Sequence, residues 1–244
     1  MSVAGLRVLI IVPARGGSKG IPGKNLRSVA GRSLVAHAAL IASALPWVDA
    51  SILTTDDPDI AAEGRRYGLE VPFLRPPNLS HDEATSVDVW RHAWLTTEAL
   101  HGHIYDLSIL LEPTSPLRRV EDIESAMQAL LDSGVDCCFT VSPTPAHYTP
   151  EKTLLIRNDA RIDFYLPLDQ AQTTRQKIRP YVHRNGICYI VRRPHLFNHL
   201  MIVSPGSLPL LIDRPVVNID EPFELELADW LYRRDYPSST DLTH

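Results

Sequence analysis

The chain has few cysteines. Only three occur in 244 residues, the adjacent pair Cys137 and Cys138 and the single Cys188. Three thiols cannot all pair, and their spacing matches no zinc-binding pattern, so neither a disulfide framework nor a zinc site is expected. The two adjacent cysteines lie in an apolar stretch and are expected to pack in the core. A reducing cytoplasm is the simplest location for such a protein.

Long hydrophobic runs and an excess of positive charge are also missing. No apolar stretch approaches the ~20 residues that span a bilayer, and residues 1–12 predict a first strand because no small-residue cleavage site precedes Pro13. The 24 basic and 29 acidic residues give a formal net charge of −5. Such a chain is a poor candidate for non-specific nucleic-acid binding. The 44% hydrophobic and 22% charged content is ordinary for a globular protein and excludes a fibrous or wholly disordered chain.

Short apolar runs alternate with amphipathic stretches along the chain. Continuous apolar runs suit strands that are buried on both faces, and their alternation with helices favours an α/β fold with a mostly parallel sheet. Helices are expected over residues 33–45, 57–67, 85–100, 120–131 and 221–232. Strands are expected over residues 7–12, 50–54, 71–74, 107–111, 137–141, 186–191, 208–212 and 216–219.

The regular pattern breaks between residues 142 and 184. This stretch is rich in proline, threonine, glutamine and arginine, and it has no clean period. A structureless loop of that length is unusual in a compact domain, so we expect an insertion with short strands of its own that packs on a partner chain. The length then fits a single domain over residues 1–236, with a polar tail over 237–244.

The loop after the first strand carries the strongest functional signal. Residues 15–25 contain four glycines and the three cations Arg15, Lys19 and Lys24. Glycine lets the backbone approach a ligand closely, and cations at the carboxyl end of a parallel strand suit a polyphosphate. Neither the P-loop pattern nor the dinucleotide G-x-G-x-x-G pattern matches. A merely flexible turn would gain nothing from three cations of one sign.

Two segments together resemble a known family. The stretch PARGGSKGIPGKN over residues 13–25 and the stretch LLEPTSPLR over residues 110–118 are similar to the acylneuraminate cytidylyltransferases, which make CMP-activated nonulosonic acids. The similarity runs from Val8 to about Ala228. It implies a single three-layer, Rossmann-like nucleotidyltransferase domain that acts as a homodimer. Its substrates would be CTP and an acidic 2-keto sugar, with Mg²⁺ as cofactor and pyrophosphate as the leaving group.

The resemblance also implies roles for individual residues. Arg15, Lys24 and Asp220 would be catalytic, and Asp220 and Asn218 would hold Mg²⁺. CTP would contact Ala14, Arg15, Gly16, Ser18, Lys19, Lys24, Asn25, Arg75 and Ser86. The sugar would contact Glu112, Thr114, Ser115, Arg118, Arg175, Gln176 and Asn185. The neighbouring run His81, Asp82 and Glu83 is expected to be solvated, because contiguous loop residues rarely converge on one ligand.

Three positions depart from the family pattern. Glu112 stands where glutamine is usual, Asn218 stands where aspartate is usual, and Arg184 is shifted by one residue so that His183 takes its place. Asn218 removes one negative charge, and Asp220 could instead cap the following helix. Two alternatives therefore stay open. One is the same reaction on another acceptor, such as Kdo or a phosphonate, and the other is a non-catalytic nucleotide-binding dimer.

Overall fold

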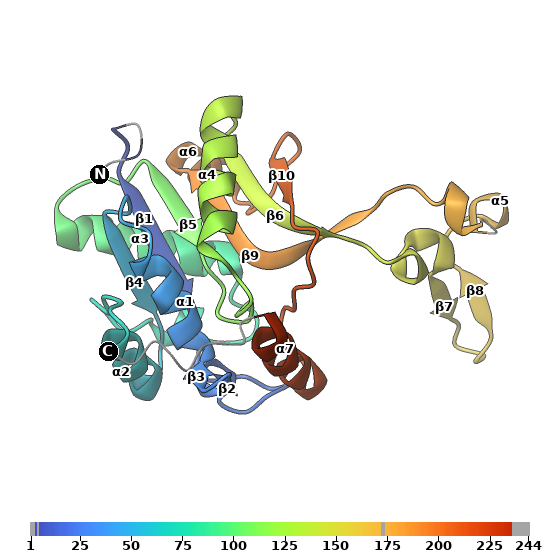
Figure 1. Cartoon of the computed structure of the whole chain (residues 1–244), viewed down its shortest axis with the longest axis horizontal. Coiled ribbons are helices and arrows are strands. Elements are labelled where there is room, and N and C mark those ends of the chain that lie inside the picture. The colour runs from blue at the N-terminus through green and yellow to red at the C-terminus, as the bar shows by residue number, and fades with distance from the viewer. Residues whose placement is uncertain (1–2, 4, 172–173, 236–244) are drawn as a thin grey trace.

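The computed structural model describes residues 3, 5–171 and 174–235, and it is built around one six-stranded sheet (Figure 1). The strand order is β10-β6-β9-β5-β1-β4, and every strand runs in one direction except β9, which is antiparallel to β5 and β6. The predicted mostly parallel sheet is confirmed. The strands are β1 Val8–Pro13, β4 Ala50–Thr54, β5 Leu107–Leu110, β6 Cys137–Pro143, β9 Val182–Arg192 and β10 Leu208–Leu211.

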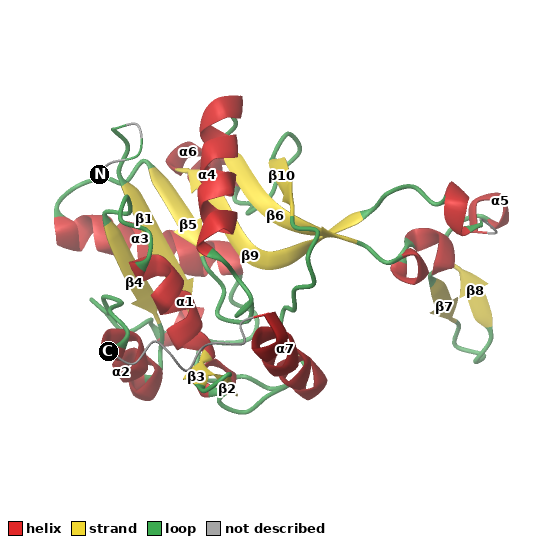
Figure 2. Ribbon diagram, in the orientation of Figure 1, coloured by secondary structure: helices red, strands yellow, loops and turns green. Residues whose placement is uncertain are grey.

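Helices cover both faces of the sheet and make three layers (Figure 2). Alternate residues of β1 face opposite sides, as the pleat of a strand requires. Val8, Ile10 and Val12 pack with α1, α2 and α4, whereas Leu9 and Ile11 pack with α3 and α6. The helices are α1 Leu34–Ser43, α2 Pro58–Arg66, α3 Ser86–His101, α4 Val120–Ser133, α6 Arg193–His199 and α7 Pro222–Asp235.

The helix ends follow the capping residues in the sequence. Ser33 precedes α1, and its side chain accepts a hydrogen bond from the backbone N–H of Ala36, while the Asp57 side chain accepts two at the start of α2. Gly134 ends α4 in the left-handed conformation, which costs glycine little. The predicted helices are therefore confirmed to within a few residues. A short hairpin of β2 Ser28–Val29 and β3 Arg32–Ser33 connects the glycine-rich loop to α1.

Two predicted strands are wrong. Residues 71–74 form no strand, because pairing beside β4 stops at Glu70 and the next residues include Pro72, which has no N–H to donate. Residues 216–219 also lie outside the sheet. The backbone N–H of Ile219 donates instead to the carbonyl of Thr114 at 2.8 Å, so this segment packs on the turn after β5.

An arm projects from the end of the β6–β9 pair, away from the rest of the chain (Figure 1). β6 and β9 stay paired as far as Pro143 and Val182. The arm between them contains the predicted short strands, as the hairpin of β7 Leu154–Ile156 and β8 Ile162–Phe164, and the short helix α5 Leu168–Ala171. The predicted polar tail over 237–244 lies outside the described residues. No described helix combines the length and the apolar character needed to cross a membrane.

Candidate active site

A cavity of about 380 Å³ opens where β1 and β5 end. Open α/β sheets bind their ligands at this edge, because the loops that follow parallel strands converge there. The cavity brings together residues that lie more than 200 positions apart in the chain. Its lining includes the predicted residues Arg15, Lys24, Asn25, Arg75, Ser86, Glu112, Thr114, Asn218 and Asp220.

The glycine-rich loop is folded tightly against its neighbours. A β-carbon on Gly20 would lie 2.7 Å from the backbone oxygen of Asp220, so only glycine allows this approach. The buried Asn25 side chain donates to the carbonyl of Arg15 at 2.9 Å and fixes the shape of the loop. Lys24 Nζ donates to the carbonyl of Ile219 at 3.0 Å and to Asp220 Oδ1 at 2.9 Å. Lys24 thus links the loop to the acidic end of the cavity.

Four predicted loop residues do not line the cavity in this structure. Ala14 is buried, and its backbone N–H donates to the carbonyl of Thr54 at 3.0 Å. Gly16 and Ser18 lie on the loop outside the cavity lining. The Lys19 side chain is 84% exposed, so it can reach a ligand only from the solvent side. Their contacts with CTP stay predictions.

Asp56 supports the site, although it is not among the residues predicted from the sequence. Its Oδ1 accepts from the backbone N–H of Gly16 at 3.0 Å and lies 3.7 Å from Arg75 Nη2. One carboxylate therefore positions both the glycine-rich loop and the guanidinium of Arg75. The signal that could have identified it is its place, two residues after β4, at the same sheet edge as the loop.

Arg75 pairs with Asp56 but has unused N–H donors beside the cavity. Its side chain is only 4% exposed, yet Nε and Nη2 have no hydrogen-bond partner within the described chain. Burial lowers the pKa of Arg75, and Asp56 partly opposes this effect. Buried polar groups are normally hydrogen-bonded. The two unused N–H donors therefore indicate a ligand with acceptor atoms at this wall.

Asp82 lies on the cationic side of the cavity. Residues 81–83 are exposed, as predicted, but His81 and Asp82 also line the cavity. The two carboxylate oxygens of Asp82 accept from Arg15 Nη1 at 2.7 Å and from Lys19 Nζ at 2.5 Å. These hydrogen bonds from Lys19 and Arg15 hold the pKa of Asp82 below its usual range. The Asp82 carboxylate thus pairs with two cations of the loop. A phosphate group that binds these cations would take the place of this carboxylate.

Glu112, Asn218 and Asp220 form the acidic end of the cavity. Burial raises the pKa of Glu112, and Asp220 adds to the effect, while Arg118, Arg184 and Lys24 oppose it. A β-carbon on Gly186 would lie 2.9 Å from Glu112 Oε2 and 3.3 Å from Asn218 Nδ2, so both side chains crowd the same point. Gly186 has φ +72°, in the left-handed region, and its missing side chain leaves room for both.

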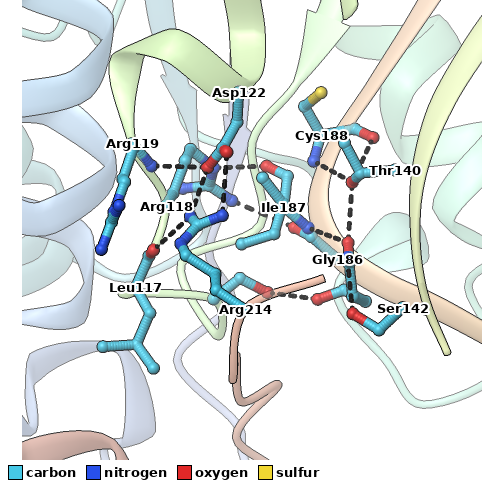
Figure 3. A network of polar contacts seen from close by, with 12 residues as sticks. Leu117, Arg118, Arg119, Asp122, Thr140, Ser142, Gly186, Ile187, Cys188 and Arg214 are labelled. Atoms are coloured by element: carbon cyan, nitrogen blue, oxygen red, sulfur yellow. Dashed lines mark hydrogen bonds and ion pairs between the residues drawn. The ribbon is translucent and has the colours of Figure 1, made fainter. Parts of the chain in front are cut away.

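Three predicted sugar residues, Ser115, Arg118 and Asn185, are buried behind the cavity. Arg118 donates to the carbonyl of Glu112 at 2.8 Å. It also donates to the carbonyl of Gly186 at 3.1 Å and to that of Ile187 (Figure 3). Burial lowers its pKa to about 10. Ser115 Oγ donates to the carbonyl of Asn185 at 3.1 Å. These side chains hold the turn after β5 against β9, and their contact with a sugar stays a prediction.

Arg175 and Gln176 are not brought to the cavity of their own chain. They lie in a short turn of helix, Arg175–Lys177, on the projecting arm (Figure 1). Gln176 is exposed, and the Arg175 side chain lies outside what the structure describes. A contact of either residue with the sugar would therefore require a second copy of the chain.

The oxygen atoms at the acidic end suit a hard cation such as Mg²⁺. Asn218 Oδ1 is buried and accepts no hydrogen bond from any described residue. The described residues contain no group of three or more His, Cys, Asp or Glu placed to hold a metal ion. Mg²⁺ needs fewer protein ligands than that, because it takes one or two carboxylates and completes its shell with water and substrate phosphates. The residues present therefore fit the expected cofactor.

A three-layer α/β fold with a cationic glycine-rich loop at the ends of parallel strands defines a Rossmann-like nucleotide-binding protein. Residues 9–202 match the cytidylyltransferase family, and the chain belongs to that family. The resemblance read from the two sequence segments is thereby confirmed, as is the fold class.

Relatives match over nearly the whole chain. CMP-N,N'-diacetyllegionaminic acid synthase of Legionella pneumophila is 29% identical over 229 residues, which cover 93% of this chain and 96% of the relative. Pseudaminic acid cytidylyltransferase of Campylobacter jejuni is 26% identical over 235 residues, covering 96% and 100%. The solved structure of CMP:2-keto-3-deoxy-manno-octonic acid synthetase complexed with CTP superposes with a TM-score of 0.69, covering 94% and 99%. At 19% identity, that structure supports the fold alone.

Proposed function

We propose that this enzyme transfers CMP from CTP to the anomeric hydroxyl of a nonulosonic acid and releases pyrophosphate. The proposal rests on one cavity that brings together Arg15, Lys24 and the buried Arg75, whose Nε and Nη2 donors have no hydrogen bond to a described residue. A guanidinium can donate to the carbonyl oxygen of cytosine, and the loop cations can neutralise a triphosphate. The two named relatives, which match over 93% and 96% of this chain, act on acids of this class.

The reaction forms a bond between the sugar oxygen and the α-phosphorus of CTP and breaks the bond from that phosphorus to the pyrophosphate oxygen. Arg15 and Lys24 would stabilise the negative charge that develops on the phosphates, and Arg75 with Ser86 would hold the base and ribose. When bound between Asn218 and Asp220, Mg²⁺ would neutralise phosphate charge and acidify the attacking hydroxyl. Positioning and charge neutralisation therefore supply the catalysis.

A pyrophosphate-release assay tests this proposal. CTP and Mg²⁺ are combined with legionaminic, pseudaminic or neuraminic acids, or with Kdo, in separate reactions. Release with a nine-carbon acid is expected. Pyrophosphate release only with Kdo would show that Kdo is the acceptor. Tight CTP binding without pyrophosphate release in the presence of any sugar would instead favour a non-catalytic nucleotide-binding protein.

The same proposal includes a homodimer built through the arm. Leu154, Ile156 and Ile162 on the β7–β8 hairpin are exposed to 51%, 83% and 56%, which is unusual for large apolar side chains on one small element. Pairing two arms by two-fold symmetry would cover them and could carry Arg175 and Gln176 to the cavity of the other copy. Light scattering should give about twice the chain mass of 27.3 kDa. A stable monomer would refute the dimer without affecting the assignment of the cavity.

We also propose the cytoplasm as the location of the enzyme. All three cysteines are buried and unpaired, which suits a reducing compartment.

A further inference from the structure

Glu112 and Asn218 come together at the acidic end of the cavity although they lie on different loops. Glu112 Oε2 and Asn218 Nδ2 are 2.9 and 3.3 Å from the single point where a β-carbon on Gly186 would stand. Asp220, two residues after Asn218, lines the same cavity and pairs with Lys24 Nζ at 2.9 Å. Two carboxylates and the amide of Asn218 therefore line one part of the cavity beside the glycine-rich loop.

Unlike Asp220, the other two side chains of this group have oxygen atoms without a partner among the described residues. Asn218 Oδ1 is buried without a hydrogen bond. The Glu112 carboxylate has neither an ion pair nor a hydrogen bond to any residue that the structure describes. A buried acceptor such as Asn218 Oδ1 is unfavourable without a hydrogen-bond partner unless a ligand compensates, and the half-buried Glu112 carboxylate beside it is open to the cavity.

Two of the three cations whose charge acts on Glu112 are engaged elsewhere, and the third, Arg184, is exposed and forms no hydrogen bond or ion pair with Glu112 among the described residues. Arg118 directs its guanidinium to the carbonyls of Glu112, Gly186 and Ile187. Lys24 donates to Asp220 and to the carbonyl of Ile219. The partner that Glu112 and Asn218 Oδ1 lack is therefore an external cation or donor that enters the cavity with the substrates.

We infer that Glu112 is a ligand of the divalent cation that accompanies CTP, and that it shares this cation with Asn218 and Asp220. The inference rests on the proposed function, because it assumes that CTP occupies the cavity. Mg²⁺ takes one or two carboxylates together with phosphate oxygens, and Glu112 with Asp220 supplies two. The alternative, in which Glu112 faces the sugar directly, sets its carboxylate against that of an acidic substrate with no cation between them.

The metal dependence of CTP binding distinguishes these roles without any turnover. Calorimetry without sugar gives the Kd for CTP in EDTA and in Mg²⁺. The Kd in EDTA divided by the Kd in Mg²⁺ measures how strongly the metal favours nucleotide binding. Glu112→Gln should lower this ratio at least about tenfold, since even indirect supports of metal ligands contribute 10–100-fold in affinity. In EDTA the variant should bind CTP no more weakly than wild type, because it has lost a negative charge beside the triphosphate.

A second substitution tests the placement of the charge. Asn218→Asp in the Glu112→Gln background returns a carboxylate to the neighbouring position and should restore the ratio to within about threefold of wild type. Glu124→Gln, on the exposed face of α4, removes the same charge far from the cavity and should leave the ratio unchanged. If Glu112→Gln does not fold, Glu112→Asp can be used instead. It keeps the charge, but its shorter side chain moves the carboxylate oxygens away from the cation, so it should also lower the ratio.

Each outcome bears on one hypothesis. An unchanged ratio in the Glu112 variants, or a lowered ratio that Asn218→Asp fails to restore, overturns the inference. The sugar-facing role predicts the first of these results, with an altered preference among keto-acid sugars. Failure of the wild-type protein to bind CTP under either condition would instead refute the proposed function.

Discussion

Replacement of Arg75 by methionine should weaken CTP binding without weakening the fold. The Arg75 side chain is 4% exposed, and its buried Nε and Nη2 donors make no hydrogen bond to a described residue, although Nη2 lies 3.7 Å from Asp56 Oδ1. Each unsatisfied buried donor costs about 1–3 kcal/mol, and an apolar side chain of similar length removes that cost. The free energy of unfolding should therefore stay constant or rise.

The effect on CTP has the opposite sign. Hydrogen bonds that involve a charged group contribute about 1.5–3 kcal/mol, so the loss of one such bond to the cytosine should raise the Kd for CTP roughly 10–150-fold. Asp56 should stay in place in the variant, because its Oδ1 also accepts from the backbone N–H of Gly16 at 3.0 Å.

Urea unfolding and calorimetric titration with CTP measure the two quantities separately. Arg66→Met is the matched control, because that side chain is 74% exposed on α2 and away from the cavity, and neither quantity should change. An unchanged Kd for CTP in Arg75→Met would refute the assignment of this residue to the nucleotide. A loss of stability as large as the loss of binding energy would show that Arg75 supports the fold.

Four further predictions follow from the contacts. Lys24→Ala should lower kcat/KM for CTP at least about tenfold in the pyrophosphate assay, because it removes a charge-assisted contact, and an unchanged value would contradict its role. Asp56→Ala should raise the KM for CTP, with Asp56→Asn partly restoring it, because the amide oxygen can still accept from the loop. Ile156→Glu should convert a dimer to a monomer in light scattering. Burial lowers the pKa of His37, so the unfolded state takes up a proton first and the free energy of unfolding should fall as the pH drops below about 6.5. Urea unfolding of His37→Gln should show a shallower pH dependence.

Residues that act locally were predictable from the sequence. The continuous apolar run of β1 needs burial on both faces, and the caps Ser33 and Asp57 bind their own helix starts. The glycine-rich loop is equally local, because its glycines and cations are contiguous and follow the strand directly. In each case the interacting residues are only a few positions apart in the sequence.

Residues whose role depends on a distant partner were missed or placed differently. Residues 71–74 and 216–219 have β-strand composition, but a strand also needs a free sheet edge with matching donors. The sequence predicts only that Asp82 is exposed, because no neighbouring residue indicates its ion pairs with Arg15 and Lys19. Arg118 lies in the expected motif, yet its guanidinium points to backbone carbonyls.

The two departures from the family pattern near the proposed metal site are best understood as one compensated change. In the sequence, Glu112 adds a negative charge and Asn218 removes one, and the two positions are far apart. The structure brings both side chains to within 3.3 Å of the same point at Gly186. Coulomb energy depends on the distance between charges and not on which loop carries them, so the cavity retains its number of carboxylates. A cation bound there would therefore face the same negative charge as in the family pattern, with one carboxylate supplied by Glu112 in the turn after β5.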